Sequence, residues 1–109
     1  MENLSDLKIL SHRELKALTP LEIKDYFSQI KDWEFLESQK ILKVFNFEDF
    51  AKAMEFVNQV AKLAEKEGHH PDIAIHYNKV EITLWTHFVN GLSINDFIMA
   101  TKIDNTQQV

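Results

Sequence analysis

Four of the five histidines fall within a stretch of 19 residues, at His69, His70, His76 and His87. Imidazole gains and loses protons near neutral pH, so a histidine cluster of this kind indicates general acid–base chemistry. Pro71 favours an extended backbone at His70, and we expect the side chains of the pair His69–His70 to diverge. The two neighbouring histidines are therefore predicted to have two different roles.

Two carboxylates stand near these histidines in the predicted fold. Glu65 lies one turn before the histidine pair on a predicted helix, where it could orient a histidine by hydrogen bonding. Asp96 follows Ser93 by three residues, which is the spacing of a capping box at a helix start. That structural role alone would explain Asp96, so a structural and a functional interpretation both stay open for it.

Other chemistries find less support in the chain. His70 and His76 have the spacing of metal ligands, but strand alternation places His76 away from the loop. No cysteine is present and no H-E-x-x-H motif occurs, so we predict neither a metal site nor a cofactor. His12 and His76 are predicted to be solvated surface residues. The two glycines lie far apart, which excludes a glycine-rich phosphate loop.

Helical and strand periodicities predict the elements that must position these residues. Three helices are expected: one that begins at Thr19-Pro20, one over about Glu48 to Glu67 that ends at Gly68, and one from Ser93 to about Ile103. Four strands are expected in two hairpins: Trp33 to Glu37 and Ile41 to Phe47, with a turn at Ser38-Gln39-Lys40, then Ile73 to Tyr77 and Lys79 to His87.

This order, α-β-β-α-β-β-α, predicts an α+β fold: a four-stranded antiparallel sheet with helices packed on one face. Val80, Ile82 and Leu84 would face the helices, while Thr83 and Trp85 would lie on the bare face, which makes that face a candidate surface for assembly. Residues 1–18 are predicted to be an N-terminal tail or a short helix, and residues 19–109 a single domain.

Composition excludes several classes of function. The chain has 109 residues, no cysteine, 45% hydrophobic residues and a formal net charge of −5. An acidic surface repels phosphate backbones, so direct binding to nucleic acid is not expected. The sequence contains no apolar run of membrane-spanning length and no signal-peptide pattern, and we expect a cytoplasmic protein without a membrane partner.

The spacing Glu65-x3-His69-His70-Pro71-x5-Tyr77-x9-His87-x8-Asp96 resembles the signature of the pterin-4a-carbinolamine dehydratases. This family is also known as the dimerisation cofactor of a homeodomain transcription factor. The resemblance extends over about Leu18 to Asp104 and includes segments such as Phe47-Glu48-Asp49-Phe50, Tyr77-Asn78-Lys79-Val80 and Gly91-Leu92-Ser93. The departures lie at Gly68, Trp85, Phe88 and Asn95, where relatives often carry other residue types.

The resemblance implies a small-molecule pterin substrate, a dehydration of 4a-hydroxytetrahydrobiopterin, and a homodimer or homotetramer. By position, His69 and His87 resemble the family's proton-transfer residues, and His70 resembles the residue that binds and orients the pterin. The substrate-binding set implied in the same way is Glu65, Gly68, Pro71, Trp85, Thr86, Phe88 and Asp96. Two alternatives stay open: a non-catalytic protein that stabilises a partner's dimer, and a regulatory protein that binds a pterin without turnover.

Overall fold

The computed structural model describes residues 3–37 and 39–107. The predicted order of elements is confirmed. In chain order the elements are α1 (Pro20–Phe27), β1 (Glu34–Leu36), β2 (Lys40–Asn46), α2 (Phe50–Glu67), β3 (Asp72–His76), β4 (Lys79–Leu84) and α3 (Ile94–Asn105). Three short 3₁₀ helices lie at Leu4–Asp6, His12–Glu14 and His87–Val89.

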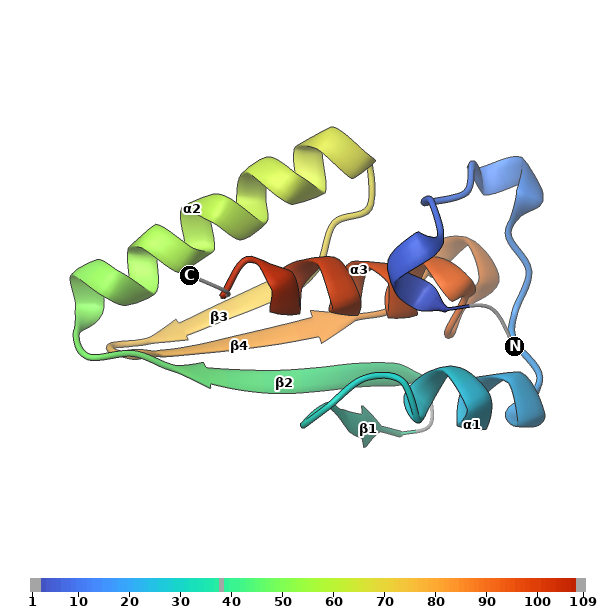
Figure 1. The fold of residues 1–109 in the computed structure, drawn as a ribbon, viewed down its shortest axis with the longest axis horizontal. Coiled ribbons are helices and arrows are strands. Elements are labelled where there is room, and N and C mark those ends of the chain that lie inside the picture. Colours follow the sequence, from blue (N-terminus) through green and yellow to red (C-terminus); the bar gives the residue numbers. More distant parts are fainter. Residues whose placement is uncertain (1–2, 38, 108–109) are drawn as a thin grey trace.

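The four strands form one antiparallel sheet in the order β1-β2-β4-β3, and the helices cover one of its faces (Figure 1). The register pairs Ile41 of β2 with Leu84 of β4, and Phe45 with Val80. Val80, Ile82 and Leu84 have no exposed surface, so the predicted alternation along β4 is confirmed. The predicted fold class, α+β with helices packed on one face, is therefore correct.

The last strand ends earlier than predicted, and this changes the position of His87. β4 stops at Leu84, because Thr86 pairs with Gly91 across a short loop instead of continuing the ladder: the Thr86 N–H donates to the Gly91 carbonyl at 2.7 Å. Asn90 completes this loop in a left-handed conformation, with φ of 52°. His87 is consequently the first residue of a 3₁₀ helix and not the end of a strand.

Other element boundaries also differ from the prediction by one or two residues, and those of β1 and β2 each shift by one residue, so that Lys40 begins β2 and does not lie in the turn. α2 begins at Phe50 and not at Glu48, because the Asp49 side chain accepts a hydrogen bond from the Lys52 N–H at 2.9 Å and caps the helix. β3 runs from Asp72 to His76, because Tyr77 adopts a φ of 56° and begins the turn. α3 continues to Asn105, two residues past the predicted end. Ser38, in the predicted turn of the first hairpin, lies outside the described residues.

The predicted capping of α1 is present. The Thr19 hydroxyl accepts from the Glu22 N–H at 3.2 Å, and the Glu22 carboxylate accepts from the Thr19 N–H at 2.9 Å. The hydrogen bonds from the Thr19 N–H and hydroxyl hold the pKa of Glu22 below its usual value.

The N-terminal segment packs against the rest of the molecule. Leu4 is only 2% exposed and belongs to the hydrophobic core, and Leu15 is also buried. The Leu10 N–H donates to the Asn95 side-chain oxygen at 2.8 Å, and the Asn95 amide donates back to the Leu10 carbonyl at 3.0 Å. The segment therefore follows the end of the molecule where α3 begins (Figure 1).

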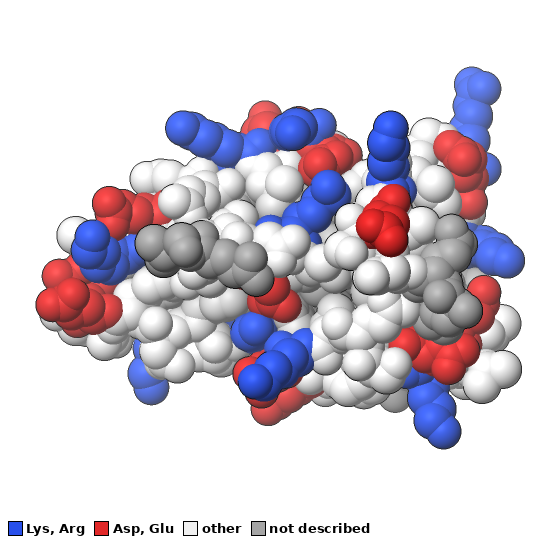
Figure 2. Space-filling view, viewed as in Figure 1, with Lys and Arg blue, Asp and Glu red and all other residues white. Residues whose placement is uncertain are grey.

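Positive and negative side chains are mixed on the face seen in Figure 2, with lysines and arginines beside aspartates and glutamates. In the described part of the chain, no helix is both long enough and apolar enough to cross a membrane.

Candidate active site

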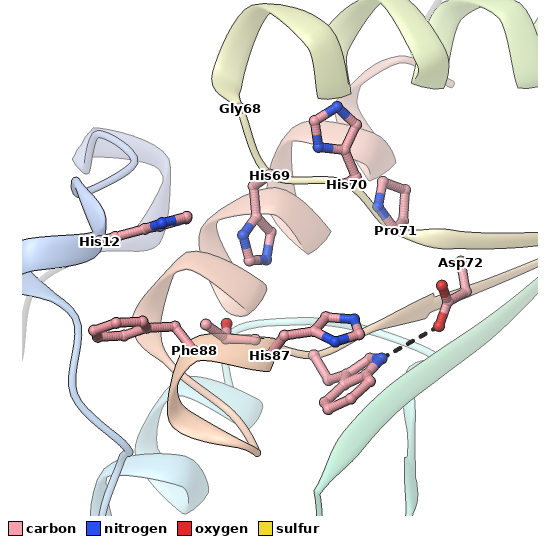
Figure 3. Close-up of a pocket in the computed structure, with 10 residues that line it drawn as sticks. His12, Gly68, His69, His70, Pro71, Asp72, His87 and Phe88 are labelled. Carbon is pink, nitrogen blue, oxygen red and sulfur yellow. Dashed lines mark hydrogen bonds between the residues drawn. The ribbon is translucent and has the colours of Figure 1, made fainter.

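A cavity of about 310 Å³ lies where the α2–β3 connection meets the loop that follows β4 (Figure 3). Its volume is at the lower end of the usual range for small-molecule pockets, about 300–1,000 Å³. The lining residues are His12, Gly68, His69, His70, Pro71, Asp72, Trp85, Thr86, His87 and Phe88. Four of the ten are histidines, whose side chains can donate and accept protons near neutral pH.

His69 is the buried histidine of the site, with 7% of its surface exposed. Gly68 ends α2 in the left-handed conformation, φ 70° and ψ 24°, and this turn directs the next residue inward. The Nε2 atom of His69 lies 2.7 Å from the Oδ1 atom of Asp96. Because a carboxylate only accepts, the proton lies on Nε2 in the neutral ring, and Nδ1 remains free to accept another proton.

Asp96 is fully buried and holds several groups at once. Its Oδ2 atom accepts from the Thr86 hydroxyl at 2.7 Å and from the Ser93 N–H at 3.0 Å. A hydroxyl has one proton, so Thr86 donates to Asp96 and the Ser93 hydroxyl donates to Thr86, at 2.7 Å. Asp96 thus combines the two roles that the sequence left open: it completes the predicted capping box of α3, and it orients His69.

His87 reaches the cavity from the opposite side to His69, since one histidine follows α2 and the other follows β4 (Figure 3). Its ring contacts Trp85, with the ring centroids 3.7 Å apart and the planes 37° apart. The Trp85 Nε1–H donates to Asp72 Oδ2 at 3.2 Å, and Lys40 Nζ lies 4.6 Å from the centroid of the Trp85 ring. His87 is therefore supported by an aromatic ring that is itself held at two points.

The His70 ring turns away from His69, as predicted (Figure 3). Its Nε2 atom lies 2.5 Å from Glu65 Oε2, and both side chains are largely exposed. Glu65 is therefore placed to orient His70, while His70 and Pro71 form the outer edge of the cavity.

The structure brings together most of the predicted site. Eight of the ten predicted residues line the cavity; Glu65 and Asp96 do not, but each bonds to a lining histidine. His76 lies exposed at the end of β3 and outside the cavity, as expected. Within residues 3–37 and 39–107, no group of three or more histidines and carboxylates is arranged to hold a metal ion.

Two lining residues, Asp72 and His12, were not predicted from the sequence. Asp72 follows the His-His-Pro segment directly, and its position beside that segment was a usable signal. His12 is exposed, as predicted, but it is not only a solvated residue: it lines the cavity and stacks on Phe88 with centroids 5.8 Å apart. No local pattern connects His12 to residues far along the chain, so only the fold shows this contact.

Comparison with known proteins gives a consistent result. A family model described as pterin 4 alpha carbinolamine dehydratase matches residues 16–106. A protein from Alkaliphilus metalliredigens is 39% identical over 98% of both chains. A protein from Nitrosococcus oceani is 41% identical over 95% of this chain and 96% of its own. Both bear the name "Putative pterin-4-alpha-carbinolamine dehydratase".

Two solved structures are similar. A transcriptional coactivator/pterin dehydratase from Brucella melitensis is 35% identical, with a TM-score of 0.79, and covers 84% of this chain and 98% of its own. A pterin dehydratase-like protein identified as a RuBisCO assembly factor in the alpha-carboxysome is 26% identical, with a TM-score of 0.59, and covers 68% of this chain and 87% of its own.

Proposed function

This chain belongs to the pterin-4a-carbinolamine dehydratase family, and from that premise we propose that it removes water from 4a-hydroxytetrahydrobiopterin to give quinonoid dihydropterin. The observation that carries the proposal is that two imidazoles, those of His69 and His87, enter one cavity from opposite sides. Two such imidazoles can serve as the proton donor and the proton acceptor that a dehydration needs.

The reaction balances without a redox step. The C4a hydroxyl takes a proton from a protonated imidazole, the C4a–O bond breaks, and water leaves. A ring N–H gives its proton to a neutral imidazole, and the electrons of that bond complete the quinonoid double bonds. His69 and His87 carry these two transfers, and Asp96 stabilises the positive charge on His69 whenever that ring is protonated.

The other residues of the predicted set bind the pterin or support the site. His70 lies at the open edge of the cavity, where its hydrogen bond to Glu65 orients the ring. It contributes more to the affinity for the pterin than to the rate of the reaction. The aromatic rings of Trp85 and Phe88 provide apolar surface for a flat bicyclic ligand. Thr86 and Asp96 contribute by holding the loop and His69 in place.

A stopped-flow measurement tests the proposal. Chemically generated 4a-hydroxytetrahydropterin should decay faster with the protein than without it, after subtraction of the uncatalysed rate. His69→Ala and His87→Ala should each lower kcat by about 10²-fold or more with a small change in KM, whereas His70→Ala should mainly raise KM. The double variant His69→Ala/His87→Ala should fall to near the uncatalysed rate.

His76→Ala is the matched control, because it removes an exposed histidine outside the cavity. It should leave kcat and KM unchanged. Normal rates in all three cavity variants, with the fold intact, would contradict the proposed mechanism.

A second candidate function is a binding module without turnover. The observation in its favour is the similarity to a pterin dehydratase-like protein identified as a RuBisCO assembly factor. Wild-type protein that binds a dihydropterin but leaves the decay rate unchanged would support this candidate over the dehydratase.

We also propose that copies of this chain pair through the uncovered face of the sheet. Val44 on that face is 45% exposed and Leu36 is 37% exposed, and no helix of the described chain covers them. Apolar side chains on an uncovered face are typical of an assembly surface.

A further inference from the structure

We propose that His12 is a substrate-positioning residue, which forms with Phe88 one wall of the cavity and holds the pterin through ring contact. The identity of the ligand rests on the proposed function. His12 lies outside residues 16–106, the part of the chain that the family model matches, so the family assignment gives it no role.

The first observation is the contact itself. The rings of His12 and Phe88 are stacked, with centroids 5.8 Å apart and planes only 13° apart. Both line the cavity, and they lie together at the side away from His70 and Pro71 (Figure 3). Phe88 remains 65% exposed. A large apolar ring that stays this exposed beside a pocket has surface available for a flat ligand.

The second observation is that the backbone on both sides of His12 is fixed. Leu10 exchanges two hydrogen bonds with Asn95, which is 1% exposed, and Leu15 is buried. Ser11 bonds to Glu14 through its hydroxyl at 2.9 Å, which stabilises the short helix that carries His12. His12 is therefore held over the cavity by its neighbours in the chain.

The first turn of α3 connects this wall to the proton-transfer site. Asn95 fixes Leu10, while the adjacent Asp96 fixes His69. Two consecutive residues of one helix thus set the distance between His12 and His69. A ligand that fits between these walls is presented to His69 in one orientation, and for that reason we assign His12 to positioning.

The surroundings of His12 support binding over proton transfer. Among the described residues it has a stacking contact and no ion pair, whereas His69 and His70 each have a carboxylate partner. A stacking contact of an aromatic ring corresponds to about a 3- to 10-fold change in affinity. We therefore expect His12→Ala to raise Kd and KM by about this factor, with kcat within about 2-fold of wild type.

The experiment measures the Kd of 7,8-dihydrobiopterin by titration calorimetry and the kinetic constants by stopped flow, for wild type, His12→Ala, His12→Phe and Arg13→Ala. Arg13 is the matched control, because it lies on the same short helix, is exposed and does not line the cavity. His12→Phe keeps an aromatic ring over Phe88 and should retain the wild-type Kd. Arg13→Ala should behave like wild type.

The outcomes separate this inference from the proposed function. If wild type binds the pterin and His12→Ala binds it equally well, the positioning role is wrong. If His12→Phe loses as much affinity as His12→Ala, His12 does not hold the pterin through ring contact. If His12→Ala lowers kcat and leaves Kd and KM unchanged, His12 does not position the substrate by binding. If wild type binds no pterin, the proposed function itself fails, and the positioning role fails with it.

Discussion

His69 and His70 are neighbours in the chain, yet each has its own carboxylate partner. His69 is buried against Asp96, and His70 is exposed beside Glu65. The difference in burial matters, because a hydrogen bond in a region without water is stronger and holds a ring in one orientation. At the scale of residues, the site is therefore a fixed inner imidazole with a second, outer one.

Asp96→Asn tests how far the inner histidine depends on its partner. The asparagine oxygen can still accept from Thr86 and Ser93, but its NH₂ group would face His69 Nε2 and favour the wrong tautomer. We expect kcat to fall by about 10²-fold or more, with a smaller change in KM. Stopped-flow kinetics, with circular dichroism to check the fold, would measure this. An unchanged kcat would show that Asp96 is only a helix cap.

At the scale of elements, the ends of two helices position the site. The C-terminal end of α2 delivers both histidines of the pair, and the N-terminal end of α3 delivers Asp96. Gly68 allows α2 to end directly before the histidine pair, because its φ of 70° is accessible to glycine without strain. The Ala64 carbonyl accepts from the Gly68 N–H at 2.8 Å, so the helix ends at a defined residue.

Gly68→Ala should lower the free energy of unfolding by about 1–2 kcal/mol, because an alanine in the left-handed region is strained. A built Cβ at Gly68 meets nothing within 4 Å, so the strain comes from the backbone alone. Urea denaturation would measure the loss. The matched control is Gly91→Ala, where φ is ordinary and the nearest atom lies at 4.0 Å. An equal loss in both variants would contradict the explanation from backbone conformation.

At the scale of the whole molecule, the sheet has one covered and one uncovered face. The covered face packs against α2 and α3 and holds the core. The uncovered face presents Leu36, Leu42 and Val44 beside polar residues, and β3 is an edge strand that pairs with β4 on one side and has no strand on its other side in the described chain. Both features expose the chain to association with other copies.

We expect light scattering at micromolar concentration to give a mass of two or four chains. Val44→Lys places a charge in the middle of the uncovered face and should shift the equilibrium toward the monomer. Leu21→Lys, at an exposed position on α1, is the control and should leave the mass unchanged. A wild-type mass near that of one 12.8 kDa chain would contradict the proposed assembly.

The order of elements and the residues that face the core could be predicted from the sequence, and so could most of the residues that line the cavity. The order of elements and the core follow from local patterns: hydrophobic periodicity, the Ser93–Asp96 cap and the glycine after α2. Each local pattern involves residues that are near one another in the chain, and for this reason it could be predicted without the fold. Most of the cavity residues follow instead from the resemblance of the spacing from Glu65 to Asp96 to the family signature.

The end of β4 and the contacts between distant residues could not be predicted without the fold. The end of β4 at Leu84 depends on the Thr86–Gly91 pairing, which gave no signal in the strand pattern itself. The position of His12 beside Phe88 depends on Leu4 in the core and on the bonds from Asn95 to Leu10. The contacts of His12 with Phe88 and of Leu10 with Asn95 join segments separated by tens of residues, and their free energy comes from packing and hydrogen bonds that exist only after the chain has folded.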